Sequence, residues 1–118
     1  MKTDPLRVPH YIAHILEAIN RIDTYTAEID EAAFLTNKLV QDAVIRNIEI
    51  IGEAARNIQK HHPEFATLHA TVPWEDMYLM RNRLAHGYFS IDYELVWQTI
   101  RRDIPELHML IRSLSDQV

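Results

Sequence analysis

The stretch YELVWQTIRRDIPELHMLIRSL, residues 93–114, decides the fold class of this chain. Its apolar side chains recur every three or four residues, a spacing that lines one face of an α-helix. Ser90 or Asp92 is suited to cap the start of this helix, and Pro105 predicts a kink one turn upstream. The side chains expected to face inward are Tyr93, Val96, Trp97, Ile100, Ile104, Leu107, Ile111 and Leu114.

The same period recurs in the first half of the chain. A first helix is expected to start at Asp4-Pro5 and to fade at Asp23-Thr24, where short polar side chains compete with the backbone. A second, longer helix is expected from Asp30 to His61, and Gly52 inside it suggests that another helix approaches closely. The apolar stripes of these helices are Ile12, Ile15, Leu16, Ile19 and Ile22 in the first, and Leu39, Val44, Ile48, Ile51, Ala55 and Ile58 in the second.

A third helix is expected to open at Pro73, after a loop or single turn over residues 64–71. Its inner face carries Trp74, Met77, Met80 and Leu84, and Gly87 is placed as a left-handed C-terminal cap. Four amphipathic helices with short connections predict an all-α, up-down four-helix bundle with a kinked last helix, as a single domain over residues 1–118.

Composition excludes several classes of function. The chain contains no cysteine, which excludes disulfides, zinc–thiolate sites and thiol catalysis. Charge and Pro5 precede any apolar run, so no signal peptide is expected, and no stretch is long and apolar enough to cross a bilayer. We therefore expect the protein to be cytoplasmic. The net charge of -5 makes it a poor non-specific ligand for nucleic acid, so any RNA site needs a local concentration of basic groups.

Such a concentration occurs in the segment MRNRLAHGY, residues 80–88, which lies in a run without acidic residues from Leu79 to Ile91. On a continuous helix, Asn82, Arg83 and His86 would share one face. Arg81 would lie about 140° from His86, at the edge of the core. An arginine in that position needs a carboxylate partner, because an unpaired buried charge is costly. The candidate partners are Glu49 and Glu53 on the long helix.

These residue types suit RNA cleavage without a metal ion or other cofactor. A histidine with an ordinary pKa of roughly 6.5 can accept a proton from a ribose 2′-hydroxyl or donate one to the leaving 5′-oxygen. The guanidinium of Arg81 can stabilise charge that builds on the phosphoryl oxygens, and Asn82 can orient the phosphate or the imidazole. One histidine hardly serves as acid and base together, so a second copy of the chain would solve this difficulty.

The motif resembles that of the HEPN superfamily, in which an arginine, a polar residue and a short spacer precede a histidine. Tyr88, two places after His86, resembles the narrower pattern of HepT ribonuclease toxins. The likeness also extends to the segments IIGEA at residues 50–54, Trp74, Trp97 and Ile104-Pro105. It therefore covers most of the chain.

The resemblance implies a HEPN-like fold and a homodimer with two motifs facing one composite cleft. It implies a metal-independent endoribonuclease toxin with Arg81 and His86 as catalytic residues and Asn82 in support. It also implies a nucleotidyltransferase antitoxin of the MNT type, which silences the toxin by attaching AMP to Tyr88. Arg83 is added as an RNA-binding residue because of its place on the His86 face.

Each of these residues also has a simpler interpretation. His86 can serve only as a cation at a helix C-terminus, Arg81 as a tie between helices, and Tyr88 as a packing residue. His10 and His14 have metal-ligand spacing, but no glutamate completes a zinc-protease pattern. The alternative for the whole chain, favoured by its acidic charge, is a non-catalytic HEPN module that docks a nucleotidyltransferase or a nucleotide.

Overall fold

The apolar periodicity of the sequence is realised as a bundle of helices. The structure is a computed structural model that describes residues 7–86 and 90–118. Its longer helices are α1 (Val8–Thr26), α3 (Lys38–His61), α5 (Trp74–Arg83) and α6 (Tyr93–Ser115). The shorter elements are helices α2 (Glu31–Thr36) and α4 (Pro63–Leu68) and strands β1 (Ala85–His86) and β2 (Ser90–Ile91). This architecture confirms the predicted all-α fold, with α4 as the turn expected near residues 64–71.

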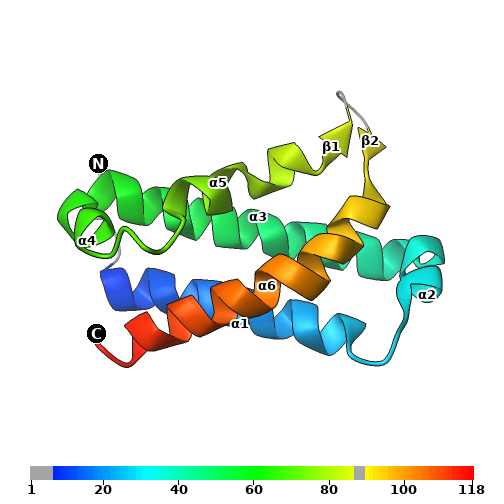
Figure 1. The fold of residues 1–118 in the computed structure, drawn as a ribbon, viewed down its shortest axis with the longest axis horizontal. Coiled ribbons are helices and arrows are strands. Elements are labelled where there is room, and N and C mark those ends of the chain that lie inside the picture. Colours follow the sequence, from blue (N-terminus) through cyan, green and yellow to red (C-terminus); the bar gives the residue numbers. More distant parts are fainter. Residues whose placement is uncertain (1–6, 87–89) are drawn as a thin grey trace, which may run out of the picture.

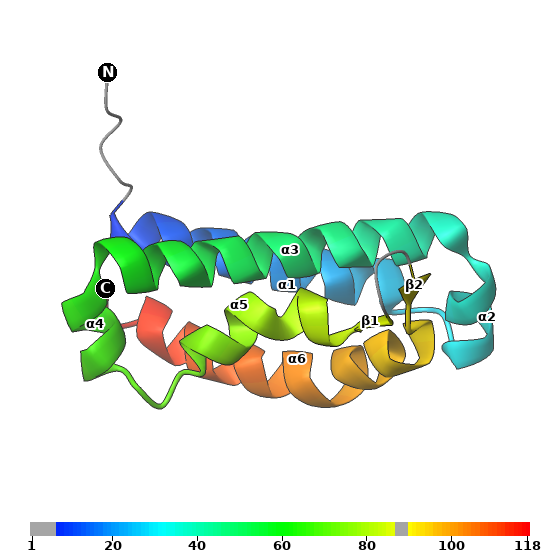
Figure 2. The same cartoon turned by 90° about the horizontal axis from the view of Figure 1, so that it is seen from above.

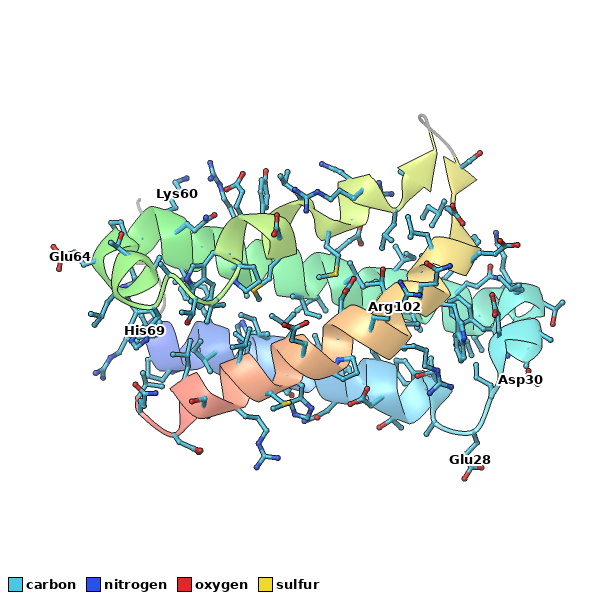
Figure 3. The ribbon with its side chains drawn as sticks, viewed as in Figure 1. Glu28, Asp30, Lys60, Glu64, His69 and Arg102 are labelled. Atoms are coloured by element: carbon cyan, nitrogen blue, oxygen red, sulfur yellow. The ribbon has the colours of Figure 1, made fainter. Side chains whose placement is uncertain are left out.

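The central helix of the bundle is α3, which packs against α1 on one side and α5 on the other. Helix α6 crosses over α1 and also contacts α2 (Figure 1). The strand pair stands at one end of the bundle, between α5 and α6, and α4 closes the other end (Figures 1 and 2). The side chains drawn in Figure 3 fill the space between these helices and radiate from their outer faces.

Isoleucines from three helices form the centre of the core. The fully buried ones include Ile12, Ile15, Ile19 and Ile22 on α1, Ile48, Ile51 and Ile58 on α3, and Ile104 and Ile111 on α6. Leu39 was predicted to join them, and this prediction is wrong, because its side chain is 80% exposed. Leu39 lies five residues before Val44, so the three-to-four-residue spacing does not carry it onto the same face.

The long second helix of the prediction is interrupted once. Asp30 caps α2 by accepting a hydrogen bond from the Ala33 N–H at 2.9 Å. Asn37 then adopts an extended backbone, and its side chain accepts from the Val40 N–H at 3.1 Å, which caps α3. The single helix expected from Asp30 to His61 is thus two helices, because the short amide of Asn37 offers the backbone a competing hydrogen bond.

The ends of α1 and α6 show how local polar groups set helix boundaries. Helix α1 runs to Thr26, beyond the predicted fade at Asp23-Thr24, and the Thr26 hydroxyl donates to the Ile22 carbonyl at 2.8 Å within the helix. Asp92 caps α6 by accepting from the Leu95 N–H at 3.0 Å, and Pro105 lies inside that helix.

The predicted start of the first helix at Asp4-Pro5 lies outside the described residues, in which α1 begins at Val8. No helix in residues 7–86 or 90–118 has the length and apolar character needed to span a membrane.

Candidate functional site

Helix α5, which carries the arginine of the motif, is anchored at its first residue. The indole N–H of Trp74 donates to the carbonyls of Ala66 and His69, each at 3.2 Å. One turn later, the side chain of Met77 is buried in the core. These contacts fix the start of α5, so the position of its last turn depends on how α5 lies on α3.

Gly52 determines how closely the two helices approach. A Cβ atom at this position would lie 3.0 Å from the backbone carbonyl oxygen of Met77 and 3.3 Å from that of Tyr78. A side chain here would push α5 away, which confirms the expectation that the glycine marks a close helix contact. The roughly 1 kcal/mol that glycine costs a helix is the disadvantage of this arrangement.

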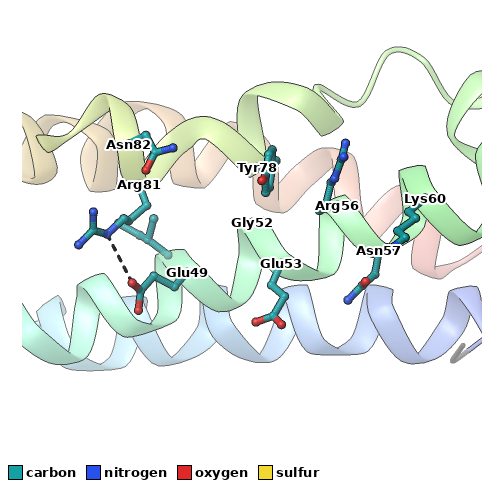
Figure 4. A pocket seen from close by; sticks show the side chains of 10 residues that line it. Glu49, Gly52, Glu53, Arg56, Asn57, Lys60, Tyr78, Arg81 and Asn82 are labelled. Atoms are coloured by element: carbon teal, nitrogen blue, oxygen red, sulfur yellow. Dashed lines mark ion pairs between the residues drawn. The ribbon is translucent and has the colours of Figure 1, made fainter. Parts of the chain in front are cut away.

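Arg81 lies one turn beyond this contact and pairs with α3. Its Nε is 3.4 Å from Glu49 Oε2, and both side chains are 41% exposed. The predicted carboxylate partner is therefore Glu49 rather than Glu53. Among the described residues, the shielded Nε–H makes no hydrogen bond, so the contact is an ion pair without hydrogen-bond geometry. Figure 4 shows the two terminal nitrogens beyond Nε, away from the Glu49 carboxylate.

Asn82 and Arg83 follow Arg81 but have different surroundings. Asn82 is exposed and lines the same groove as Arg81. Arg83 Nη1 instead donates to Asp76 Oδ1 at 2.8 Å, in an exposed pair between residues seven apart on α5. Within the described residues, Arg83 does not line the groove. The structure thus brings Arg81 and Asn82 together and places Arg83 elsewhere.

The predicted helical relation between Asn82, Arg83 and His86 is wrong. Helix α5 ends at Arg83, and the backbone of His86 belongs to β1, paired with Ser90 of β2. The Asp92 N–H donates to the Leu84 carbonyl at 2.8 Å and closes this pairing. The Leu84 carbonyl, which would accept a hydrogen bond from the next turn of a continuous helix, accepts one from Asp92 instead. The helix-face argument that added Arg83 to the site no longer applies.

Two other predicted features lie outside the described residues, namely the Gly87 cap and the Tyr88 side chain. The side chain of His86 is likewise outside them, although its backbone is described. The structure therefore leaves the roles assigned to His86 and Tyr88 as predictions.

A groove of about 530 Å³ runs between α3 and α5 and ends at Arg81. Further along it lie Arg56, Asn57, Lys60 and Tyr78, which sequence reasoning had not selected. The Arg56 guanidinium carbon is 5.1 Å from the centre of the Tyr78 ring (Figure 4). Gly52, Arg56 and Lys60 follow one another at intervals of four, a spacing that indicates one helix face. That pattern was visible in the sequence, but nothing in it showed that α5 faces it.

The histidines weighed as metal ligands lie far along the chain from this groove. His10 and His14 are both exposed on α1, and the His14 ring makes an edge contact with Tyr11. In the part of the chain that the structure describes, no three or more His, Cys, Asp or Glu side chains gather as they would around a metal ion.

Known proteins resemble this chain over most of its length. The family model described as "Ribonuclease HepT-like" matches residues 15–114. The chain is 45% identical over 97 residues to "Probable ribonuclease HepT" of Thermococcus cleftensis, covering 82% of the chain and 86% of that protein. It is 41% identical over 100 residues to a "putative RNase" of Methanocaldococcus jannaschii, covering 85% and 89%.

A third relative, also from Methanocaldococcus jannaschii, is larger. Its name combines "gamma-glutamylcyclotransferase" with "putative RNase", and it is 41% identical over 108 residues, which are 92% of this chain but 47% of that protein. No solved structure matches the chain.

Proposed function

The chain belongs to the HepT-like ribonuclease family, and on that premise we propose that it is a metal-independent endoribonuclease toxin acting in the cytoplasm. The observation that carries the proposal is the family match over residues 15–114, which includes Arg81 and His86. The structure supports it by placing Arg81 at one end of the groove, with its terminal nitrogens turned away from Glu49.

The reaction is an intramolecular transesterification, in which the phosphoryl group of the RNA chain passes from a 5′-oxygen to the neighbouring 2′-oxygen. His86 takes the proton of a ribose 2′-hydroxyl, the 2′-oxygen attacks the adjacent phosphorus, and the bond to the 5′-oxygen breaks. The 5′-oxygen then takes a proton, which leaves a 2′,3′-cyclic phosphate and a free 5′-hydroxyl. Arg81 stabilises the charge on the non-bridging oxygens, and Asn82 beside it orients the phosphate.

A homodimer completes the proposal. One imidazole cannot accept and donate protons in the same concerted step, so His86 of a second copy supplies the acid. Two facing motifs also double the local positive charge in a chain whose net charge is -5. Arg83 contributes to RNA binding only when it leaves Asp76, and an exposed pair of this kind is worth about 1 kcal/mol or less.

The toxin is controlled, in this proposal, by an MNT-type nucleotidyltransferase antitoxin that attaches AMP to Tyr88. The added phosphate would place negative charge two residues from His86, where an RNA phosphate must bind. The acidic net charge favours the second candidate function, a binding module without catalysis. The two candidates differ in whether purified, unmodified protein cuts RNA.

Cleavage of RNA by the purified protein in EDTA tests the proposal. We expect the unmodified chain to cut RNA and to leave 2′,3′-cyclic phosphate ends. His86→Ala and Arg81→Ala should each lose at least a hundredfold in rate, because each removes a group that acts in the transition state.

His10→Ala and Arg102→Ala are the matched controls, since both side chains are exposed on other helices. The intact mass of the protein is measured before the assay, to establish that Tyr88 carries no AMP. Failure of this unmodified protein to cut single-stranded or structured RNA would favour the binding module, and full activity of His86→Ala would contradict the assigned mechanism.

A further inference from the structure

The part of the α3–α5 groove beyond Arg81 contains an aromatic ring and two cations that have no role in the proposed reaction. These are Tyr78 on α5 and Arg56 and Lys60 on α3 (Figure 4). Tyr78 is 42% exposed, so part of its ring is accessible to a ligand in the groove. It lies three residues before Arg81, so both side chains project from one face of α5.

Arg56 and Lys60 form no ion pair within the described residues. The ion pairs of the described part of the chain are Arg21–Glu17, Arg81–Glu49 and Arg83–Asp76, and none of them involves Arg56 or Lys60. Glu53, which also lines the groove, turns away from α5, whereas Arg56 extends alongside Tyr78 (Figure 4). Arg56 and Lys60 are therefore available to an anion that enters between α3 and α5.

The pairing of Arg56 with Tyr78 is suited to a nucleobase. An aromatic ring and a guanidinium plane both stack on bases, and neither discriminates strongly among them. A base stacked on Tyr78 places its own phosphates within the reach of the long cationic side chains of Arg56 and Lys60. Along α3, the distance from Glu49 to Lys60 is eleven residues, or roughly 16 Å, which is enough for a short run of nucleotides.

We infer that this groove binds single-stranded RNA next to the scissile phosphate, with one unpaired base stacked on the exposed part of the Tyr78 ring and the adjoining phosphates held by Arg56 and Lys60. The inference rests on the proposed function for the class of ligand. It specifies an unpaired strand, because the bases of a duplex are stacked inside the helix and their faces are not available to the Tyr78 ring.

Binding is measured separately from cleavage by fluorescence anisotropy with a labelled 2′-O-methyl RNA oligonucleotide. This probe has no 2′-hydroxyl nucleophile, so it stays intact whether or not the protein is a ribonuclease. Tyr78→Ala should weaken binding at least fivefold, since a stacked base contributes that much or more. Tyr78→Phe keeps the ring and should stay within twofold of the unmodified protein.

The cations are tested through the salt dependence of the same binding. Arg56→Gln and Lys60→Gln should each make the slope of log K against log salt shallower by about 0.7, as expected when one phosphate contact to a single strand is lost. Arg102→Gln is the matched control, because it removes an exposed positive charge from α6, well away from Lys60 (Figure 3). Thermal melting confirms that each variant is folded.

The outcomes separate this inference from the proposed function. Binding that depends on Tyr78 and Arg56 supports the groove even if the protein cuts no RNA. Slopes that are the same for Arg56→Gln and Arg102→Gln overturn it even if cleavage is normal. Tighter binding of a duplex than of its single strand also overturns it.

Discussion

Arg81 is oriented by an ion pair that leaves its terminal nitrogens able to donate hydrogen bonds to another group. The ion pair uses Nε, 3.4 Å from Glu49, and leaves the terminal amino groups for another partner. A guanidinium that must bind a phosphate in the transition state benefits from such pre-positioning, because less rotational freedom is lost when the substrate arrives. Glu49 is therefore a positioning residue in the proposed mechanism.

The role of Glu49 is tested with Glu49→Gln, which keeps the shape of the side chain and removes its charge. We expect kcat to fall about tenfold with KM nearly unchanged, because Arg81 is then less often in its productive position. Unfolding free energy should change by about 1 kcal/mol or less, since the pair is half exposed. Steady-state kinetics and urea denaturation measure the two quantities.

Two controls test this interpretation of Glu49. Glu17→Gln breaks the exposed pair with Arg21 on α1 and should leave kcat unchanged. In an Arg81→Ala background, Glu49→Gln should have no further effect on the residual rate, because the carboxylate acts through the arginine. An equal loss in both backgrounds would contradict the positioning role.

Among the helices, the contact of α5 with α3 positions the residues of the proposed site. It brings the backbone of α5 against Gly52, and it places Arg81 and Tyr78 over the α3 side chains that line the groove. The anchoring of Trp74 by two carbonyls holds the other end of α5. A change in this helix contact should move Tyr78 and Arg81 together rather than one side chain.

Gly52→Ala tests the contact between α3 and α5. The added Cβ meets backbone oxygen at 3.0 Å, which cannot rotate away, so α5 must shift. The gain of about 1 kcal/mol in helix propensity offsets much of the packing cost, which is about 1–3 kcal/mol. We therefore expect only a small loss of stability but at least a tenfold loss of RNA cleavage.

A size series sharpens this test. Gly52→Val should lower both stability and activity further than Gly52→Ala, because a branched side chain forces α5 further from α3. Thermal melting followed by the cleavage assay gives both values for each variant. Full activity in both variants would show that the position of α5 on α3 does not matter for the site.

For the whole molecule, the question is whether one chain or two form the catalytic unit. In the proposed mechanism one imidazole cannot act as acid and base together, so the proposed dimer supplies a second imidazole and more positive charge to a chain of net charge -5. This arrangement makes activity depend on both copies. It therefore predicts a characteristic response when active and inactive chains are mixed.

Wild-type chain is mixed with increasing proportions of His86→Ala after partial denaturation and refolding together. If both histidines act in one site, activity falls with the square of the wild-type fraction, because only dimers of two wild-type chains are active. If each chain acts alone, activity falls linearly with that fraction. A linear response would refute the shared site, and mixing with His10→Ala should leave activity unchanged.

The helical class, most of the core and two long-range contacts could be predicted from the sequence alone. Those features depend on local spacing: apolar residues every three or four positions place Ile48 or Ile104 inward whatever the neighbouring helix is. Gly52 and Arg81 indicated a close approach and a carboxylate partner, because a glycine and a half-buried charge are each costly without them.

The end of the motif helix and the helix faces that meet depend on contacts between distant parts of the chain, which the sequence pattern does not show. The helix carrying the motif ends at Arg83 because the Leu84 carbonyl accepts a hydrogen bond from Asp92, a residue that a helical pattern does not bring near. The pairing of Arg56 with Tyr78 likewise joins residues 22 positions apart on different helices. Local propensity is a sum over neighbours in the chain, whereas a groove is formed by surfaces that meet only after the chain has folded.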